Sequence, residues 1–432
     1  MLKNLFFAFF LISAVLPLQD SELFAASKKK SIKKKSSKKA NVNKIKKTVP
    51  ETKDDLKSES KEGINAPYAL LYEDETNTIL FENNADKEMD PASMTKMLTA
   101  YVVMDQLKAG LIKQDTLFTV SKNAYRKEGS TSFLELDSKV SVIDLLKGLI
   151  VQSGNDAAIA LAEGIAGTES AFAEMMNKKA KDLAMEKTNF TNSSGIPDEK
   201  HKTTARDLLI LAKRLREDFP EFYPLWSDSS FEHNKVNQMN RNPLLDDKDL
   251  GCDGIKTGCS SVSGYSLTAT CSKNGRRLYA VINGLKDKKD RAVEARNIMN
   301  YGFNVFDTYR LFDAQHVVDE IPVWYGTANY ATIGFLKPVA FTHKKFDPKD
   351  VKVEFRYDES LKAPLAKGEV LGKVTIQIQG EKNIEVPIVN LVEIKESGFI
   401  KKAYDSLMHL FGARSYKGDK KNLKPIIHMT EK

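Results

Sequence analysis

Strand-like runs stand at both ends of a long helix-forming block in residues 63–306, and this order constrains the fold more than any other feature of the sequence. The expected elements are β runs at 68–72 and 78–82, helices within 93–107 and 141–215, β runs at 254–258, 265–271 and 278–283, and a helix over about 291–306. Such short runs are not stable alone, so strands from the two ends are expected to pair in one antiparallel sheet. With helices packed on that sheet, the sequence predicts the α+β class.

The composition changes after Phe306. Residues 316–394 carry short alternating β runs, such as Val351-Val353-Phe355, separated by turn signals that include Lys367-Gly368 and Gln379-Gly380. We therefore expect a separate small all-β domain over 307–394. Little in that stretch indicates catalysis.

The positive charge is concentrated outside the folded middle of the chain. The net charge is +8, yet residues 28–47 contain eleven lysines and no acidic residue, so residues 48–394 are mildly acidic. Basic tails rather than a basic fold argue against nucleic-acid binding and favour contact with an anionic surface. Residues 28–62 are predicted to form a disordered lysine-rich linker, because like charges repel and little apolar area is available for burial.

Residues 1–27 have the parts of a secretory signal peptide. Lys3 supplies the positive charge, Leu5 to Leu18 form an apolar stretch, and small residues follow at Ala25 and Ala26. The apolar stretch is shorter than the roughly 20 residues that a membrane span needs. The sequence therefore predicts export.

Residues 395–432 are predicted to form an amphipathic helix followed by a basic tail. The apolar face of the helix consists of Phe399, Ile400, Ala403, Leu407, Leu410 and Phe411. With basic residues around that face, the favoured interpretation is a peripheral anchor on an anionic membrane surface. Docking of the same helix on the protein's own core stays open, because periodicity does not separate the two.

The three cysteines, Cys252, Cys259 and Cys271, have no metal-binding spacing, and no metal site is predicted. Cys252 and Cys271 are expected on neighbouring strands. A disulfide between them is possible, and the sequence does not decide the question.

One motif pairs a hydroxyl with an amine at the start of a predicted helix. Ser93 and Lys96 are three residues apart, which places them one turn apart on the same helix face. A serine hydroxyl needs a nearby base to act as a nucleophile, and an unprotonated lysine can serve. The same spacing occurs elsewhere in the lysine-rich linker, but only this copy opens an apolar-periodic helix.

Two further motifs follow in a fixed order. Ser153-Gly154-Asn155 is expected in a turn between helices, 60 residues after Ser93. Lys256-Thr257-Gly258 ends a predicted strand, 103 residues after Ser153. Each motif is weak alone, but the ordered set is the signature of class A β-lactamases and penicillin-binding proteins.

The chain closely resembles the low-molecular-mass penicillin-binding proteins that act as D-alanyl-D-alanine carboxypeptidases, serine peptidase family S11. Residues 63–306 resemble the catalytic domain, 307–394 the C-terminal β domain, and the helix after Ser397 the membrane-anchoring helix. Further matching positions are Ser194-Gly195, Asn240-Arg241-Asn242, Gly264-Tyr265, Arg291 with Glu294, and Tyr301-Gly302-Phe303. The resemblance implies a β-lactamase/DD-peptidase-like catalytic domain with an antiparallel sheet flanked by helices.

The resemblance also implies a role for each motif residue. Ser93 is the acylated nucleophile and Lys96 its general base, with a pKa lowered by the nearby cation of Lys256. Ser153 relays a proton to the leaving amine, and Asn155 orients Lys96 and the substrate amide. The groups expected at the substrate carboxylate are Lys256, Thr257, Arg241 and Arg291, with Gly258 leaving room for the ligand.

The expected oxyanion hole consists of the backbone N–H groups of Ser93 and Cys259. Many family members have histidine where this chain has Cys259, but a backbone donor survives a side-chain change. The resemblance implies no metal and no cofactor.

The expected function is removal of the terminal D-alanine from peptidoglycan stem peptides, with β-lactams as inhibitors. The alternative is a D,D-endopeptidase that cleaves crosslinks with the same residues. A β-lactamase is disfavoured because no water-activating carboxylate can be assigned, and a catalytically idle wall-binding scaffold is disfavoured by the intact motifs. The expected location is periplasmic, at the outer face of the cytoplasmic membrane.

Overall fold

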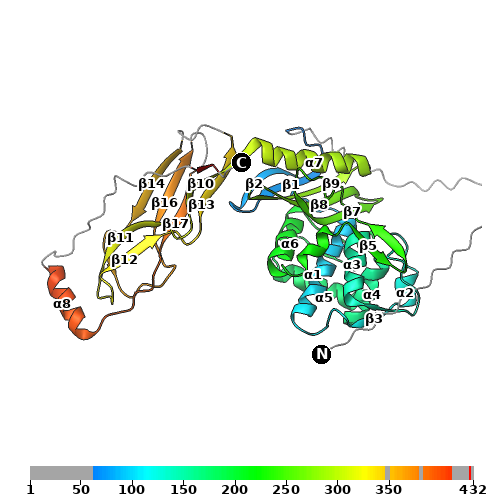
Figure 1. Ribbon diagram of the computed structural model, residues 1–432, viewed down its shortest axis with the longest axis horizontal. Coiled ribbons are helices and arrows are strands. Elements are labelled where there is room, and N and C mark those ends of the chain that lie inside the picture. The colour runs from blue at the N-terminus through cyan, green and yellow to red at the C-terminus, as the bar shows by residue number, and fades with distance from the viewer. Residues whose placement is uncertain (1–61, 346–350, 379–382, 411–427, 430–432) are drawn as a thin grey trace, which may run out of the picture. The chain divides into compact units, whose positions relative to one another are not determined.

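The computed structural model describes residues 62–345, 351–378, 383–410 and 428–429 (Figure 1). The signal peptide predicted for 1–27, and all of the predicted linker except Glu62, lie outside these residues. In the part of the chain that is described, no helix has both the length and the apolar character that a membrane crossing demands.

Strands from both ends of the first domain form one antiparallel sheet, as the sequence predicts (Figure 1). The strand order is β2-β1-β9-β8-β7, so β1 from the start of the domain pairs with β9 from its end. The bounds are β1 Tyr68–Glu73, β2 Thr78–Asn83, β7 Cys252–Ser260, β8 Gly264–Lys273 and β9 Arg276–Leu285. Both faces of the sheet are covered, because neighbouring residues such as Leu70 and Leu71 are buried in different apolar clusters.

A helical block covers one face of the sheet. Its elements are η1 Ala92–Thr95, α1 Lys96–Lys108, α2 Lys122–Tyr125, α3 Val142–Lys147, η2 Gly148–Gln152, α4 Asn155–Ala166, α5 Glu169–Asp182, α6 Ala205–Asp218 and η3 Tyr223–Ser227. Helix α1 lies at the centre of this block, and its residues from Lys96 to Met104 are all buried. Helix α6 is amphipathic, and its predicted apolar face, with Leu208 and Leu211, is buried in the same cluster.

Helix α7 (Lys288–Val305) covers the opposite face of the sheet, where Ile298 and Met299 pack in the second apolar cluster. Two small hairpins complete the domain. They are β3 Leu117–Thr119 with β4 Lys139–Ser141, and β5 Ser230–His233 with β6 Val236–Met239.

Apart from helix α8, the described residues after Val305 are built from strands and the loops between them, which confirms the predicted α+β class with an all-β C-terminal domain. The strands are β10 Phe306–Phe312, β11 Val317–Trp324, β12 Tyr330–Gly334, β13 Val339–Lys344, β14 Val351–Tyr357, β15 Leu361–Lys362, β16 Val370–Ile378, β17 Ile384–Asn390 and β18 His428–Met429. They form one sheet of order β13-β10-β18 and another of order β14-β16-β17-β12-β11-β15. Inward side chains such as Phe312, Ile333 and Ile376 share one buried cluster.

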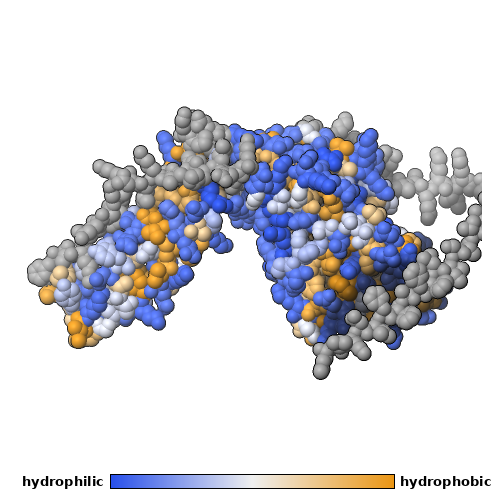
Figure 2. Space-filling model, viewed as in Figure 1, coloured by the Kyte–Doolittle hydropathy of each residue, from blue (hydrophilic) through white to orange (hydrophobic). Residues whose placement is uncertain are grey.

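The predicted C-terminal helix is present as α8 (Phe399–Leu410). It docks through polar residues: Asp405 is fully buried and accepts a hydrogen bond of 2.8 Å from the backbone N–H of Tyr325. Lys401 donates to the carbonyl of Gly326. On the apolar face, Phe399 and Ile400 are each 86% exposed. Figure 2 shows hydrophobic surface in the region of α8.

Candidate active site

The three motifs meet in one cavity of about 660 Å³. Its lining comes from the loop at Gly129-Ser130, η1, the turn after η2, the end of β6 with the loop that follows it, the end of β7, the start of β8 and the start of α7. The residues that line it and that the sequence singled out are Ser93, Ser153, Arg241, Thr257, Gly258, Cys259 and Arg291. Lys96, Asn155 and Lys256 lie behind this lining and are buried.

Ser93 and Lys96 are in direct contact, as the helical spacing predicts. Ser93 lies in the 3-10 turn η1, and Lys96 begins α1 directly after it. The Lys96 Nζ is 3.0 Å from Ser93 Oγ. The lysine side chain is completely buried, so bulk water does not compete for its amine.

The amine of Lys96 has three oxygen neighbours. Besides Ser93 Oγ, they are Asn155 Oδ1 at 2.7 Å and the carbonyl oxygen of Ser194 at 2.5 Å. The Asn155 side chain is oriented because its Nδ2 donates to the carbonyl of Glu128 at 2.7 Å. A neutral amine has two hydrogens and one lone pair, so it can donate to Asn155 and Ser194 while accepting the hydroxyl proton of Ser93.

The pKa of Lys96 is lowered from its ordinary 10.5 to about 7. Burial is the largest cause, because it penalises the charged form, and the Arg241 guanidinium lowers the pKa further. The negative charges of Asp156 and Glu169 act in the opposite direction. The predicted direction is therefore right, but its main cause is burial rather than the cation of Lys256.

Ser153 faces the cavity from a strained turn. It ends η2 with φ of 64° and ψ of 33°, the left-handed region that few residues other than glycine adopt. Its side chain is 2% exposed, and its Oγ has no hydrogen-bond partner among the described residues. Strain of this kind tends to persist where function requires a particular geometry.

Cations gather on the β7 side of the cavity. Burial lowers the pKa of Lys256 well below its ordinary value, and the positive charges of Lys96, Arg241 and Arg291 lower it further. Arg241 Nη1 donates to Ser130 Oγ at 2.6 Å, and Arg291 Nη2 donates to the carbonyl of Arg241 at 3.2 Å. No aspartate or glutamate lines the cavity. An anionic ligand would relieve the repulsion among these groups.

Gly258 is required by the protein's own packing. A Cβ atom there would lie 2.3 Å from Ser266 Oγ and 3.0 Å from the carbonyl oxygen of Pro91. Glycine thus lets the segment before Ser93 lie against β7, which brings Ser93 close to Thr257 and Cys259. The sequence analysis assigned this glycine to ligand access, and the closest neighbours are instead atoms of the chain.

The comparisons with known proteins agree with this geometry. Residues 55–287 match the family described as D-alanyl-D-alanine carboxypeptidase, and residues 306–396 match the C-terminal domain of penicillin-binding protein 5. The chain is 37% identical to D-alanyl-D-alanine carboxypeptidase DacA of Haemophilus influenzae over 350 residues, covering 80% of this chain and 89% of that protein.

The chain belongs to the D-alanyl-D-alanine carboxypeptidase family. Its relative DacC of Escherichia coli is 36% identical over 357 residues, which cover 81% of this chain and 89% of the relative.

Solved structures show the same fold. Penicillin-binding protein 5 from H. influenzae superposes with a TM-score of 0.71 at 37% identity, covering 77% of this chain and 98% of that one. The ampicillin-bound form of penicillin-binding protein D2 from Listeria monocytogenes superposes with a TM-score of 0.51 at 28% identity, over 55% of this chain and 98% of that one.

Sequence reasoning gave no role to two groups that support the family's site. The first is the Ser194 carbonyl, which reaches Lys96 because Gly195 packs against η1. A Cβ atom at Gly195 would lie only 1.9 Å from the carbonyl oxygen of Ala92, and its φ is +79°. The second is His201, which is buried and stacked on Phe190.

His201 supports the turn that carries Ser93. The backbone N–H of Thr191 donates to His201 Nδ1 at 3.0 Å, so the neutral ring carries its hydrogen on Nε2. That nitrogen lies 2.8 Å from Thr95 Oγ1, which in turn donates to the carbonyl of Ala92 at 2.8 Å. Ala92 has a positive φ of 46° directly before Ser93. No local sequence motif indicates this chain of contacts, because His201 is far from Thr95 in sequence.

Cys252 and Cys271 form a disulfide between β7 and β8, where they are directly opposite each other. This settles the pairing that the sequence left open. It ties together the two strands that carry Lys256 and Tyr265.

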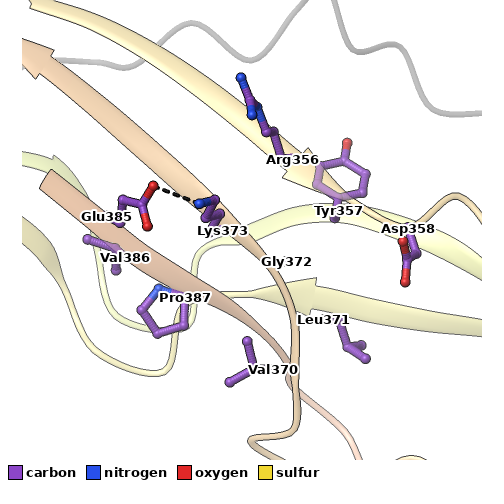
Figure 3. A pocket seen from close by; sticks show the side chains of 10 residues that line it. All are labelled: Arg356, Tyr357, Asp358, Val370, Leu371, Gly372, Lys373, Glu385, Val386 and Pro387. Atoms are coloured by element: carbon purple, nitrogen blue, oxygen red, sulfur yellow. Dashed lines mark hydrogen bonds and ion pairs between the residues drawn. The ribbon is translucent and has the colours of Figure 1, made fainter. Parts of the chain in front are cut away.

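A second hollow, of about 670 Å³, lies on β14, β16 and β17 (Figure 3). Lys373 and Glu385 form an ion pair of 2.7 Å across it, and Val386 and Pro387 contribute apolar surface. None of its lining residues is a serine, cysteine or histidine. The catalytic motifs are all at the first cavity.

Proposed function

We propose that this chain removes the C-terminal D-alanine from peptidoglycan stem peptides that end in D-Ala-D-Ala, through an acyl-enzyme on Ser93. The observation that carries the proposal is the contact of Lys96 Nζ with Ser93 Oγ. The contact lies inside a buried network in which the pKa of the Lys96 amine is lowered to about 7. A nucleophile beside a base that a third group orients is the arrangement that covalent catalysis requires.

Acylation starts with proton transfer. Lys96 takes the hydroxyl proton of Ser93 as Ser93 Oγ attacks the carbonyl carbon of the penultimate D-alanine. Asn155 and Ser194 hold the amine in place throughout, because they accept its two hydrogens. The resulting ammonium is stabilised by the same oxygens, together with the charges of Asp156 and Glu169.

Collapse of the tetrahedral intermediate releases D-alanine. Ser153, which lines the cavity, passes its hydroxyl proton to the leaving amine and takes up in its place the proton that Lys96 received from Ser93. The backbone N–H groups of Ser93 and Cys259 stabilise the oxyanion, which is the kind of preorganised donor that contributes most to acyl transfer. Water then hydrolyses the ester on Ser93 and frees the enzyme.

Recognition of the substrate's terminal carboxylate falls to the cationic side of the cavity. Arg241 and Arg291 supply positive charge, Lys256 supplies an amine donor, and Thr257 supplies a hydroxyl donor. The same charges would attract the carboxylate that β-lactams carry. Because no lining residue is a carboxylate, nothing in the cavity is suited to activate water rapidly, and a penicilloyl ester is expected to persist.

We further propose that the protein acts at an anionic membrane surface, held by α8. Its polar contacts through Asp405 and Lys401 fix the helix to the β domain and leave Phe399, Ile400 and Leu407 exposed. An exposed apolar face on an otherwise docked helix supports insertion into a lipid interface. The Cys252–Cys271 disulfide supports an exported location, because such bonds persist in oxidising compartments.

The test of the catalytic proposal is product analysis on two substrates. The full mature chain is incubated with a stem pentapeptide ending in D-Ala-D-Ala and, separately, with a crosslinked stem-peptide dimer. Release of free D-alanine from the pentapeptide by the parent chain, and none by Ser93→Ala, is expected. Cleavage of the dimer, with no free D-alanine released from the pentapeptide, would show that the chain is an endopeptidase and overturn the proposal.

A further inference from the structure

Cys259 occupies an unusual position for a free thiol. It follows Thr257 and Gly258 on β7, is exposed, and lines the same cavity as Ser93. The other two cysteines are joined to each other. Nothing in the catalytic mechanism uses this side chain, since only its backbone N–H has a proposed role.

The surroundings of the thiol are built for an anion. Arg291 lines the same cavity, is 6% exposed, and its Nε has no hydrogen-bond partner among the described residues. Its guanidinium lies over the ring of Tyr265, 5.9 Å from the centroid. Tyr265 is directly opposite Cys259 in the β7–β8 pairing.

The charged side chains that line the cavity with Cys259 all have one sign. Arg241, Lys288 and Arg291 line the cavity, and no acidic side chain does. A cavity lined by charges of one sign concentrates small molecules of the opposite charge. A buried guanidinium whose Nε has no hydrogen-bond partner among the described residues, beside an accessible thiol, thus points to a ligand that carries both a carboxylate and a reactive sulfur.

We propose that Cys259 is a site of reversible modification by carboxylate-bearing low-molecular-weight disulfides, and that the adduct closes the cavity to substrate. The inference rests on the proposed function, because the adduct occupies the cavity in which Ser93 is acylated. It would make the peptidase sensitive to the thiol–disulfide state of its compartment.

The chemical step is thiol–disulfide exchange. The Cys259 sulfur loses its proton to solvent and attacks one sulfur of the small disulfide. The S–S bond of the reagent breaks as the new S–S bond forms, and the other half leaves as a thiolate that takes up a proton. One disulfide replaces another, so no further oxidant is consumed, and a small thiol reverses the step.

The position and the charge of the adduct on Cys259 explain why it would inhibit the peptidase. The carboxylates of the adduct would lie against Arg241 and Arg291, where the substrate carboxylate is proposed to bind. The adduct also begins one residue after Gly258, beside Ser93. A β-lactam could then neither place its carboxylate against the two arginines nor reach Ser93.

The experiment compares oxidised glutathione, which is anionic, with cystamine, a cationic disulfide. The full mature chain is treated with each reagent at low and high salt, and adduct formation is followed by intact-protein mass and peptide mapping. Labelling by a fluorescent penicillin is measured on the same samples. The two matched variants are Cys259→Ser, which has no thiol in the cavity, and Cys259→Ser/Val262→Cys, which places an exposed thiol three residues away and outside it.

The expected result is one glutathionyl group on Cys259, formed about ten-fold faster than the cystamine adduct at low salt, with the ratio falling as salt screens the cavity. Penicillin labelling should fall in step with adduct formation and return after treatment with reduced glutathione. Cys259→Ser should form no adduct and keep its own level of labelling, and the Val262→Cys variant should show no preference for the anionic reagent.

Three results would overturn the inference: an adduct on Cys252 or Cys271 instead of Cys259, equal rates for the two reagents, or full labelling of a fully modified protein. Failure of the proposed function is a separate outcome. It would appear as absence of penicillin labelling before any disulfide is added, while adduct formation is still measured by mass.

Discussion

The pH dependence of acylation offers a quantitative test of the Lys96 assignment. At the ordinary lysine pKa of 10.5, about one amine in 3,000 would be neutral at pH 7, whereas at a pKa of about 7 half of them are. Burial thus raises the fraction of active base by about three orders of magnitude. Protonation removes the base, so the acylation rate should be low at pH 5, rise through a midpoint near 7, and level off above about pH 9.

Two variants should move that midpoint in opposite directions. Arg241→Gln removes a cation that lowers the Lys96 pKa, so the midpoint should rise, though not to 10.5 because burial is the larger cause. Glu169→Gln removes a negative charge that raises the pKa, so the midpoint should fall. Glutamine keeps the side-chain oxygen that accepts from the backbone N–H and hydroxyl of Ser193.

The assay is the second-order rate of labelling by a fluorescent penicillin between pH 5 and pH 10. Only the midpoint is compared, because Arg241 is also proposed to bind the ligand. Lys96→Arg, which stays charged at all these pH values, should acylate about 10²–10⁴-fold more slowly. A midpoint above pH 9 in the parent chain, or the same midpoint in all variants, would refute the reasoning.

Three further predictions concern stability and location. Burial lowers the pKa of His201 from 6.5 to about 4, so the neutral ring contributes about 3 kcal/mol to the free energy of unfolding, complete above pH 6.5 and lost as the pH falls toward 4. Urea unfolding of His201→Asn should therefore depend less on pH over that range, and an unchanged pH dependence would contradict the assignment. Replacing both Cys252 and Cys271 by serine should lower the free energy of unfolding by about 3 kcal/mol, because the bond closes a loop with a separation of 19 residues; a loss below about 1 kcal/mol in urea would speak against this. Removal of residues 396–432 should abolish sedimentation with anionic vesicles at high salt, and removal of 28–47 should only weaken it; unchanged sedimentation of the first truncation would show that α8 is not the anchor.

Much of the fold was predictable because local sequence patterns indicate its helices and strands. The β runs at both ends of the catalytic domain have strand periodicity, and only pairing across the domain can bury them, which β1 and β9 do. The Ser93–Lys96 contact was predictable for the same reason, since residues one turn apart share a helix face. The order of the three motifs then indicated that Ser153 and Lys256 belong to the same site as Ser93.

Other parts of the site depend on tertiary structure that no local pattern encodes. The Ser194 carbonyl is a backbone acceptor, so its role carries no side-chain signature. The pKa of Lys96 depends on how completely the helical block encloses it, and therefore its main cause was missed. Helix α8 shows a third case: its periodicity revealed an apolar face, but it gave no sign that Asp405 on the opposite side would be buried and dock the helix.

The central claim is that Ser93 is the residue that becomes acylated. The most direct measurement is peptide mapping by mass spectrometry of the full mature chain after reaction with benzylpenicillin at neutral pH. The account predicts a single penicilloyl group on the peptide that contains Ser93, and none on Ser93→Ala of unchanged thermal stability. A penicilloyl group on Ser153 or any other residue, or equal modification of the Ser93→Ala variant, would contradict it.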